Sequence, residues 1–315
     1  MRDHPLDCLV IGAGPAGLTA AIYLARYHLD TWVIDGGDSR AKWIPTSHNH
    51  AGFPDGINGE ELLKRMREQA VRYQAEIKNG HVTRLEKTDD GMFVADWGSG
   101  PVEARTVLLA TGVSNRRPPM IDKETHDAAM AEGLIRYCPV CDGYEVTDKR
   151  VGVIGTGDHA AAEASFIRGF TADITLIADG KQDLTSDCRD ELKEAGILRV
   201  DGPITEIRPG DGEISVSVES GETLTFDSIY PALGSDPHVQ LAEMVGALLK
   251  GERCIHVDDH MRTNIEGLYA AGDVVIGLDQ ISNAMGQGGV ASTTIRNDLA
   301  KREPIRRAPV AQAST

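Results

Sequence analysis

The sequence predicts an α/β protein with two Rossmann-like nucleotide-binding domains, and three observations carry this prediction. A glycine-rich turn at residues 12–17 follows an apolar run near the start of the chain. A similar turn at residues 155–160 follows a second apolar run in mid-chain. In both units a second apolar run follows at the same interval, so the unit repeats within the chain. Such turns between a strand and a helix are typical of three-layer nucleotide-binding folds.

Length and composition agree with an ordinary globular protein. The chain has 315 residues, 41% hydrophobic and 25% charged, enough for two domains of about 100–200 residues each. The net charge of −16 disfavours nucleic acid or an anionic membrane surface as a partner and suits a partner with a basic patch. No apolar run approaches the ~20 residues that cross a bilayer. The first residues lead directly into a strand rather than a signal peptide, and the five cysteines are an odd number, so we expect a cytoplasmic location.

The first glycine turn has the context that a dinucleotide site requires. Gly12 makes the tight turn, Gly14 lets the backbone approach a pyrophosphate, and Gly17 packs the following helix on the strand. The N-terminus of that helix would face the phosphates. Asp35 follows the second strand, where a carboxylate can accept a hydrogen bond from a ribose hydroxyl. We therefore expect a nucleotide on this first fold.

The remaining elements complete the two domains. Helices are expected at 18–27, 59–74, 161–170 and 283–299. Strands are expected at 6–11, 31–34, 81–85, 92–96, 102–104, 105–110, 150–154, 173–177, 197–200, 204–207, 214–218, 224–226, 227–232 and 267–271. Gly286, Gly288 and Gly289 lower the stability of the last helix, so a ligand or a partner backbone is expected to approach it closely.

Two cysteines between the glycine turns indicate redox chemistry. Cys138 and Cys141 are three positions apart, a spacing that can close a small disulfide ring and that often lowers the pKa of one thiol. Asp142 follows directly and is a candidate to move protons to or from the outgoing sulfur. A structural zinc site would need four ligands, and no second Cys or His pair has suitable spacing. We therefore expect a redox dithiol and no metal.

The second glycine turn leaves its ligand open. Gly155 and Gly157 match the pattern, and Ala160 replaces the third glycine while keeping close packing. A second dinucleotide site, which would include Asp158, and a framework without its ligand both remain compatible with these residues. An NADPH site usually offers arginine after its second strand, but Asp179 stands there and would repel a 2′-phosphate. Asp179 suits the free ribose of NADH, and only Lys181 nearby could offset the repulsion.

Together these residues resemble the low-molecular-weight thioredoxin reductase family, nearly from end to end. The dithiol followed by Asp-Gly, just before the second fold, is its most specific feature. The matching positions are Gly12, Gly14, Gly17, Asn49, Gly52, Phe53, Pro54, Thr111, Gly112, Cys138, Cys141, Asp142, Gly143, Gly155, Gly157, Asp158, Ala160, Glu163, Ala271, Gly272 and Asp273.

The resemblance implies FAD on the first fold and an inserted second domain. The implied FAD-binding domain is 1–116 with 248–315, and 117–247 is the inserted NAD(P)H-binding-like domain that carries the dithiol. It implies that Cys141 is the thiol on the flavin side, that Cys138 attacks the substrate, that Asp142 is the acid–base, and that the chain is a homodimer. The implied cofactor-binding residues are Gly12, Ala13, Gly14, Pro15, Ala16, Gly17, Asp35, Gly36, Asn49, Val82, Ala110, Thr111, Gly112, Gly272, Asp273, Gln280 and Ile281.

The departures from that family concern the electron donor. The family's His-Arg-Arg motif for NADPH falls on Ala178, Asp179 and Gly180. Relatives without this motif include ferredoxin-linked thioredoxin reductases and dithiol oxidases, and the latter also have proline after the first cysteine. In those oxidases His commonly follows the second cysteine, where this chain has Asp142; His50 is an alternative proton carrier.

Three functions therefore stay open from the sequence. The leading one is a FAD-dependent reductase of thioredoxin or a thioredoxin-like protein, with electrons supplied by NADPH, NADH or a ferredoxin. The second is an oxidase of a small dithiol that uses oxygen as the electron acceptor. The third is a flavoprotein that only senses redox partners, with the dithiol as its switch.

Overall fold

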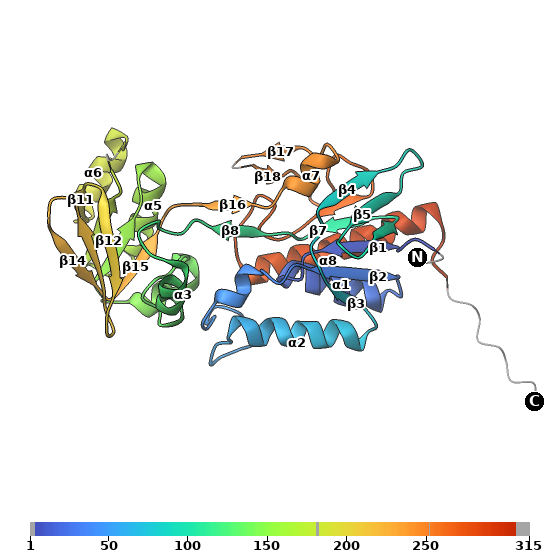
Figure 1. Cartoon of the computed structure of the whole chain (residues 1–315), viewed down its shortest axis with the longest axis horizontal. Helices are drawn as coiled ribbons and strands as arrows, with labels where there is room; N and C mark the ends of the chain where they lie inside the picture. The colour runs from blue at the N-terminus through green and yellow to red at the C-terminus, as the bar shows by residue number, and fades with distance from the viewer. Residues whose placement is uncertain (1–3, 181–182, 252, 307–315) are drawn as a thin grey trace, which may run out of the picture. The chain divides into compact units, whose positions relative to one another are not determined.

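The computed structural model describes residues 4–180, 183–251 and 253–306, which form two compact units (Figure 1). Unit 1 comprises residues 1–39, 63–112 and 237–315, and unit 2 comprises residues 40–62 and 113–236, of which only the described residues are discussed. The mixed α/β architecture with Rossmann-like parallel sheets confirms the predicted fold class. The domain limits expected from the sequence stay a prediction.

A five-stranded parallel sheet forms the centre of unit 1. Its strand order is β19 (Leu268–Ala270), β7 (Val107–Leu109), β1 (Cys8–Ile11), β2 (Thr31–Asp35) and β3 (Glu76–Asn79). All residues of β1, β7 and β19 are buried. This explains why these strands appear in the sequence as short apolar runs without alternation. The polar edge strand β3 lacks that signal, and it was not expected from the sequence.

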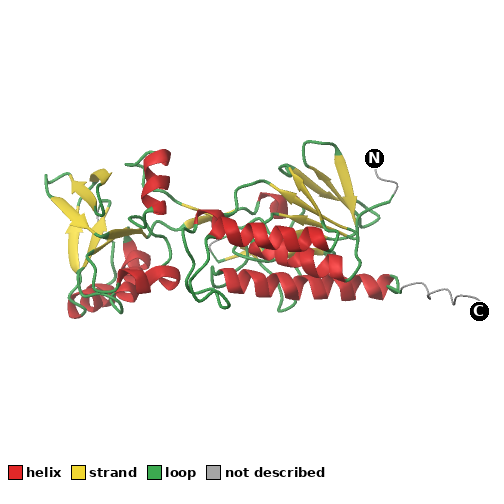
Figure 2. Cartoon of the chain, turned by 90° about the horizontal axis from the view of Figure 1, so that it is seen from below, coloured by secondary structure: helices red, strands yellow, loops and turns green. Residues whose placement is uncertain are grey.

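Helices cover one face of this sheet (Figure 2). Helix α1 (Pro15–Arg26) packs along α8 (Ile281–Arg302). A Cβ on Gly288 would lie 2.4 Å from the carbonyl oxygen of Ala16, whereas Gly286 has open space and Gly289 faces the ring of Tyr23 at ordinary distance. The expected close approach of a backbone to the last helix is therefore found at Gly288.

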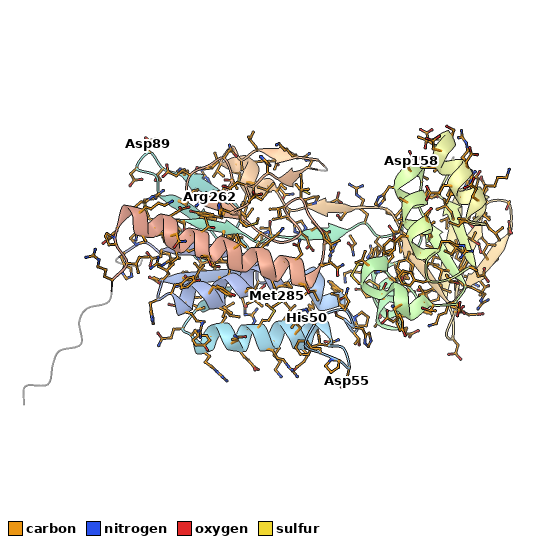
Figure 3. The ribbon with its side chains drawn as sticks, turned by 180° about the vertical axis from the view of Figure 1, so that it is seen from behind. His50, Asp55, Asp89, Asp158, Arg262 and Met285 are labelled. Atoms are coloured by element: carbon orange, nitrogen blue, oxygen red, sulfur yellow. A yellow bond between two sulfur atoms is a disulfide. The ribbon has the colours of Figure 1, made fainter. Side chains whose placement is uncertain are left out.

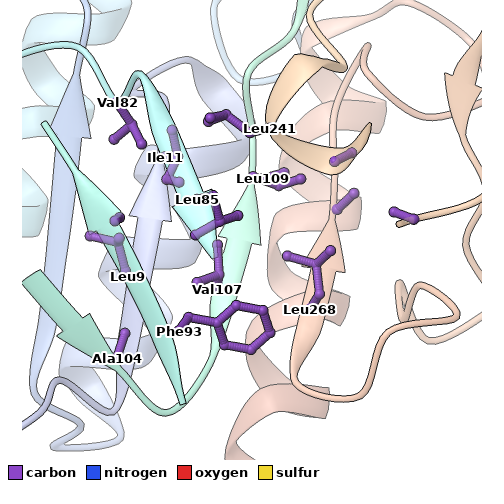
Figure 4. Close-up of a cluster of buried hydrophobic side chains, with 14 of the residues drawn as sticks. Leu9, Ile11, Val82, Leu85, Phe93, Ala104, Val107, Leu109, Leu241 and Leu268 are labelled. Carbon is purple, nitrogen blue, oxygen red and sulfur yellow. The ribbon is translucent and has the colours of Figure 1, made fainter. Parts of the chain in front are cut away.

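An antiparallel sheet covers the other face of the parallel sheet. Its strands are β4 (Arg84–Lys87), β5 (Phe93–Asp96) and β6 (Pro101–Ala104). Phe93 and Leu85 project from it onto Leu9, Val107 and Leu268 in a fully buried core (Figure 4). Unit 1 is thus a three-layer fold in which the sheet edge at the carboxyl ends of the parallel strands is left for loops.

The other elements of unit 1 are short or lie at its margin. They are α7 (Gln240–Met244), β17 (Leu249–Lys250), β18 (Cys254–Ile255) and helix α2 (Gly59–Arg72), which begins in unit 2 and continues into unit 1. None of the described helices is long and apolar enough to cross a membrane.

Unit 2 repeats the three-layer plan on a smaller scale. Its parallel sheet has the order β11 (Leu198–Asp201), β10 (Ile174–Ala178), β9 (Val151–Ile154) and β15 (Ser228–Pro231). One face packs on the antiparallel strands β12 (Ile204–Pro209), β13 (Ile214–Val218) and β14 (Thr223–Phe226). The other face packs on α5 (Gly157–Ile167) and α6 (Ser186–Glu194).

The dithiol belongs to unit 2, on the segment that contains α3 (Lys123–Ala131), α4 (Pro139–Asp142) and the short 3-10 helix η2 (Gly143–Val146). The 3-10 helix η1 (Arg40–Trp43), from earlier in the chain, also belongs to this unit. The chain passes into and out of this unit as the paired strands β8 (Val113–Asn115) and β16 (Ser235–Pro237).

Candidate active site

The dithiol is closed as a disulfide between Cys138 and Cys141, with the two Cα atoms 5.2 Å apart. Cys138 is the N-cap of the one-turn helix α4, and its Sγ accepts a hydrogen bond from the amide of Cys141 at 3.2 Å. Pro139 occupies the first helical position, where its missing N–H costs nothing. Both cysteines are half-buried. The disulfide expected from the spacing is therefore present on a turn that leaves it within reach of solvent.

Asp142 is held on both of its oxygens. Arg136 donates from Nη1 to Oδ2 at 3.1 Å, and the hydroxyl of Tyr230 donates to Oδ1 at 2.8 Å. Burial raises the pKa of the Asp142 carboxyl, while the charge of Arg136 and the bond from Tyr230 oppose the rise. A carboxyl in this setting can take up and release a proton beside the disulfide, as acid–base chemistry at a leaving sulfur requires.

Two further carboxyls lie around Asp142. Glu163 on α5 has a side chain only 14% exposed, and Glu145 on η2 has one 25% exposed. Three buried atoms here make no hydrogen bond: Oε1 of Glu163, Oε2 of Glu145 and Nε of Arg136. Burial raises the pKa of Glu163 to about 7, and the charge of Asp142 adds to the rise. The site is therefore a largely buried acidic cluster that also contains the guanidinium of Arg136.

A chain of hydrogen bonds reaches the residue before Cys138. Nε2 of His126 lies 2.7 Å from the hydroxyl of Tyr137, and its Nδ1 lies 3.0 Å from Oδ1 of Asp127. Burial raises the pKa of the Tyr137 hydroxyl above its usual range, so this hydroxyl stays protonated. The chain fixes the backbone that presents Cys138. Nothing in the sequence pattern marked His126 or Asp127 for this role.

The first glycine turn lies at the carboxyl edge of the unit 1 sheet. A Cβ on Gly17 would lie 1.9 Å from the carbonyl oxygen of Gly12, and one on Gly12 would lie 2.2 Å from that of Ala110. Gly14 is the N-cap of α1, and no side chain caps this helix N-terminus. Its first turn holds no acidic residue. Backbone amides at such an end can receive a phosphate.

The side chain of Asp35, at the end of β2, is already engaged. Its Oδ1 accepts from the amide of Gly37 at 2.8 Å, and Oδ2 pairs with Nη2 of Arg67 on α2. A ribose hydroxyl at this position would therefore meet an anchored carboxylate rather than a mobile one. A Cβ on Gly36 would lie 3.2 Å from the ring of His81, the residue before the buried Val82. Arg67 was not anticipated from the sequence.

The other expected cofactor residues of unit 1 reach the same edge from later strands. Thr111 bonds through its hydroxyl to the carbonyl of His238 at 2.7 Å, and the amide of Gly272 donates to Oε1 of Gln287 at 2.7 Å. A Cβ on Gly272 would lie 3.0 Å from that of Ala16, which places β19 beside α1. The expected cofactor residues that belong to unit 1 are Gly12, Ala13, Gly14, Pro15, Ala16, Gly17, Asp35, Gly36, Val82, Ala110, Thr111, Gly112, Gly272, Asp273, Gln280 and Ile281.

One expected cofactor residue lies in the other unit. Asn49 belongs to unit 2, where its amide donates to the carbonyl of Val140, inside the disulfide ring, at 3.2 Å. The ring of His50 stacks on Phe53 with centroids 5.5 Å apart. Asn49 therefore helps to hold the dithiol turn in unit 2.

The second glycine turn ends in acidic side chains. Asp158 lies in the first turn of α5 (Figure 3), and its Oδ1 accepts from the amide of Thr185 at 3.0 Å. Oδ1 of Asp179 accepts from the amide of Ile204 at 3.1 Å. Both carboxylates thus anchor neighbouring loops of unit 2. Lys181, which could have offset Asp179, lies outside the described residues.

The structure also describes the cysteines outside the disulfide and the side chains that could hold a metal. Among those residues no group of three or more His, Cys, Asp or Glu side chains could hold a metal ion. Cys8, Cys188 and Cys254 are not part of a disulfide. Burial raises the pKa of Cys8 to about 12, which makes that thiol unreactive. The reactive sulfur chemistry is therefore confined to the Cys138–Cys141 pair and the more accessible Cys188 and Cys254.

Comparison with known proteins agrees with this geometry. A family model described as pyridine nucleotide-disulphide oxidoreductase matches residues 6–288. A thioredoxin reductase of Listeria innocua is 32% identical over 306 residues, covering 90% of this chain and 91% of that protein. One from Mycolicibacterium smegmatis is 31% identical, covering 94% and 97%. The crystal structure of thioredoxin reductase from Streptococcus pyogenes matches with a TM-score of 0.87 at 29% identity, covering 95% of this chain and 100% of that one.

Two Rossmann-like units and a Cys-x-x-Cys disulfide beside a buried acid define a disulfide oxidoreductase. The chain belongs to the pyridine nucleotide-disulphide oxidoreductase family. Within that family it is a thioredoxin reductase-like enzyme, since its similarity to thioredoxin reductases extends over nearly all of both chains.

Proposed function

We propose that this enzyme binds FAD on unit 1 and exchanges electrons through Cys138 and Cys141 with the disulfide of a thioredoxin-like protein. The single observation that carries this proposal is the Cys138–Cys141 disulfide beside the doubly held carboxyl of Asp142. Thiolate attack on a disulfide needs a leaving sulfur that can be protonated, and Asp142 is positioned to supply or accept that proton.

The residues of unit 1 fit FAD. The uncapped N-terminus of α1 offers amides to a pyrophosphate, and Gly14 at its N-cap adds no side chain of its own. The anchored carboxylate of Asp35 follows β2, where an acidic side chain accepts the ribose hydroxyls in this type of fold. Bound there, FAD would supply the two-electron chemistry that reduces or oxidises the disulfide. Gly272 and Asp273 extend the same edge, and Gln280 with Ile281 begins α8 next to it.

The dithiol residues divide the exchange between them. Cys138 attacks the partner's disulfide, Cys141 resolves the mixed disulfide, and Asp142 exchanges the proton with Cys141. The surroundings suit a protein partner, since Val140 is 45% exposed and Tyr144 is 81% exposed beside the disulfide. The net charge of −16 favours a partner with a basic contact surface. As part of this proposal the enzyme acts in the cytoplasm, as we expect from its odd number of cysteines, and it is a homodimer, as its family resemblance implies.

The residues after β10 do not fit NADPH. Asp179 would face the 2′-phosphate, and its Oδ1 is committed to the amide of Ile204. Arg189, the first arginine after that strand, donates from Nη1 to the carbonyl of Leu184 at 2.6 Å. No step of the proposal therefore uses NADPH. The electron donors that we propose instead are NADH, a ferredoxin or a dithiol.

The misfit between NADPH and the residues after β10 favours a second function, in which the electrons flow in the opposite direction. If Asp179 keeps NADPH off unit 2 and NADH does not bind there either, a small dithiol can reduce the Cys138–Cys141 disulfide and oxygen can take the electrons. Such an enzyme would be a dithiol oxidase. It uses the same sulfur exchange, so only its partners distinguish it from a reductase.

The test is turnover of the purified yellow protein with oxidised thioredoxin and each donor in turn: NADPH, NADH and a reduced ferredoxin. We expect thioredoxin thiols to appear with at least one donor and to be lost in Cys138→Ser. Cys188→Ser, which removes another half-buried thiol, is the matched control and should keep full activity. Failure with every donor, together with oxygen uptake in the presence of a small dithiol, would replace the reductase with the oxidase.

A further inference from the structure

Glu163 is a buried carboxyl for which the sulfur exchange described above has no role. It projects from α5, which packs on the dithiol helix α4. Its side chain is 14% exposed, and Oε1 is buried without a hydrogen-bond partner. The nearest ionisable group on its own helix is His159, with Nε2 4.0 Å from Oε2. An ionised carboxylate in such a place is costly, because burial removes water that no donor replaces.

Asp142 and Glu163 differ in which form their surroundings stabilise. Asp142 receives hydrogen bonds from Arg136 and Tyr230, which stabilise its carboxylate. The buried oxygen of Glu163 receives none. Two neighbouring buried carboxyls resist double ionisation, so one of them retains a proton. The hydrogen bonds favour the charge on Asp142 and the proton on Glu163.

We propose that Glu163 is a positioning residue that holds the proton which Asp142 passes to the dithiol when the disulfide opens. This inference rests on the proposed sulfur exchange and deepens it. In the oxidised enzyme the proton rests on Glu163, and Asp142 is the carboxylate that contacts the sulfur chemistry. Arg136 and Tyr230 keep that division in place by bonding to Asp142.

Opening of the disulfide by an external dithiol moves one proton from Glu163 to Cys141. A thiolate of an external dithiol attacks Sγ of Cys138, a new S–S bond forms, and the Cys138–Cys141 bond breaks with its electron pair on Cys141. Glu163 passes its proton to the Asp142 carboxylate, and Asp142 passes it on to the Cys141 thiolate, so Glu163 becomes the carboxylate. The second external thiol releases its proton to solvent and displaces Cys138 as a thiolate. The external dithiol is oxidised to its disulfide, and the enzyme disulfide is reduced.

Other charged groups around the pair act on the same equilibrium. Glu145 on η2 raises the pKa of Asp142, and His48 lies 4.0 Å from Glu145. The hydroxyl of Tyr230 on β15 stays protonated, because burial and the Asp142 charge raise its pKa above the usual range. His159, with Nε2 4.0 Å from Oε2 of Glu163, has a side chain that is 64% exposed to solvent. The pKa of Glu163, raised by burial to about 7, supports a proton that is held near neutral pH.

The experiment measures the equilibrium between the holoenzyme and dithiothreitol across pH, with enzyme thiols counted by alkylation. If Glu163 is coupled to the dithiol, its pKa differs between the oxidised and reduced enzyme. The logarithm of the equilibrium constant then changes slope near pH 7, by up to about tenfold per pH unit. Glu163→Gln should lack this break, and Glu194→Gln, which removes an exposed carboxylate of α6, should retain it. An unchanged break in Glu163→Gln, or no break in the wild type, overturns the proposal.

A second measurement keeps the test valid if Glu163→Gln does not fold. The difference infrared spectrum of the wild-type enzyme below pH 7 should lose a protonated-carboxyl band on reduction of the disulfide. A spectrum in which that band does not change contradicts the proposal. Because dithiothreitol replaces both the electron donor and thioredoxin, these results stand apart from whether thioredoxin is the physiological partner.

Discussion

The two units share a three-layer fold but differ in where their carboxylates lie and in what these carboxylates bind. In unit 1 the glycine turn meets an uncapped helix N-terminus without acidic residues, and Asp35 is anchored by Gly37 and Arg67. In unit 2 the matching helix carries Asp158 in its first turn, and Glu163 is buried beside the dithiol without a partner for Oε1. The repeat thus keeps its framework while its chemistry diverges. One unit is suited to a bound nucleotide, and the other is suited to proton and sulfur exchange.

The largest expected effect is a difference in flavin binding and stability between glycine-to-alanine variants of the two glycine turns. Gly17→Ala places a Cβ 1.9 Å from the carbonyl oxygen of Gly12, so α1 must move off the sheet. We expect the purified variant to lose its flavin absorbance and about 3 kcal/mol of unfolding free energy. In Gly157→Ala the nearest atom is 3.8 Å away and only the positive φ of 70° is strained. That matched variant should keep its flavin and lose about 1 kcal/mol; flavin retained by both variants would contradict the difference.

The next largest effect should be a difference between Cys138 and Cys141 of unit 2 in how much mixed disulfide their serine variants trap. With oxidised thioredoxin, reduced Cys141→Ser should accumulate a mixed disulfide through Cys138, because no resolving thiol remains. Cys138→Ser should accumulate much less of it. Non-reducing electrophoresis followed by mass spectrometry measures both adducts. Equal trapping by the two variants would reject the assignment of Cys138 as the attacking thiol.

A paired carboxylate of unit 1 should stabilise the fold in a pH-dependent way. Asp298 on α8 binds Arg262 through two hydrogen bonds, at 2.7 and 3.0 Å, and Tyr269 at 2.9 Å. Burial alone would raise the pKa of Asp298, but its hydrogen bonds hold that pKa well below the usual range. Its stabilisation is therefore present above about pH 4 and is lost as the pH falls further.

The corresponding variant is Asp298→Asn, which should lower the unfolding free energy at pH 7 by about 2 kcal/mol. Urea unfolding followed by circular dichroism measures the change. Asp259→Asn, which removes an exposed carboxylate three positions before Arg262, is the control and should have little effect. A loss that is the same at pH 3 as at pH 7 would show that the ion pair is not its cause.

The pH dependence of stability that comes from Glu163 in unit 2 should be opposite to that from Asp298, and its effect on the unfolding free energy should be smaller. The folded state raises the pKa of Glu163 from 4.5 to about 7, so the folded protein binds this proton more tightly than the unfolded chain. Stability from this group is present below about pH 4.5 and is lost as the pH rises through 7. Glu163→Gln should therefore gain about 1–2 kcal/mol over the wild type at pH 8 in urea unfolding. A wild-type stability that rises between pH 6 and pH 8 relative to Glu163→Gln would contradict this assignment.

Local sequence signals predicted the parts of this protein that depend on local geometry. The Gly12 and Gly155 turns, the Cys138–Cys141 ring and the buried strands all follow from spacing and apolar runs. The partners of Asp142 do not, because Tyr230 lies 88 residues away along the chain and reaches Asp142 only through the fold of unit 2. Arg67 and Gln287 are equally ordinary in sequence. The polar strand β3 was missed because an edge strand needs no apolar run.

The most direct test of the difference between the units is anaerobic reduction of the flavin, followed by its absorbance. Dithiothreitol should bleach the flavin in the wild type and not in Cys138→Ser, because electrons from a dithiol enter through the disulfide. NADPH should leave the absorbance unchanged over the same time, because Asp179 follows β10 and would repel its 2′-phosphate. Bleaching by NADH but not by NADPH would assign the free ribose to Asp179. Rapid bleaching by NADPH would contradict the account and restore a nicotinamide site to unit 2.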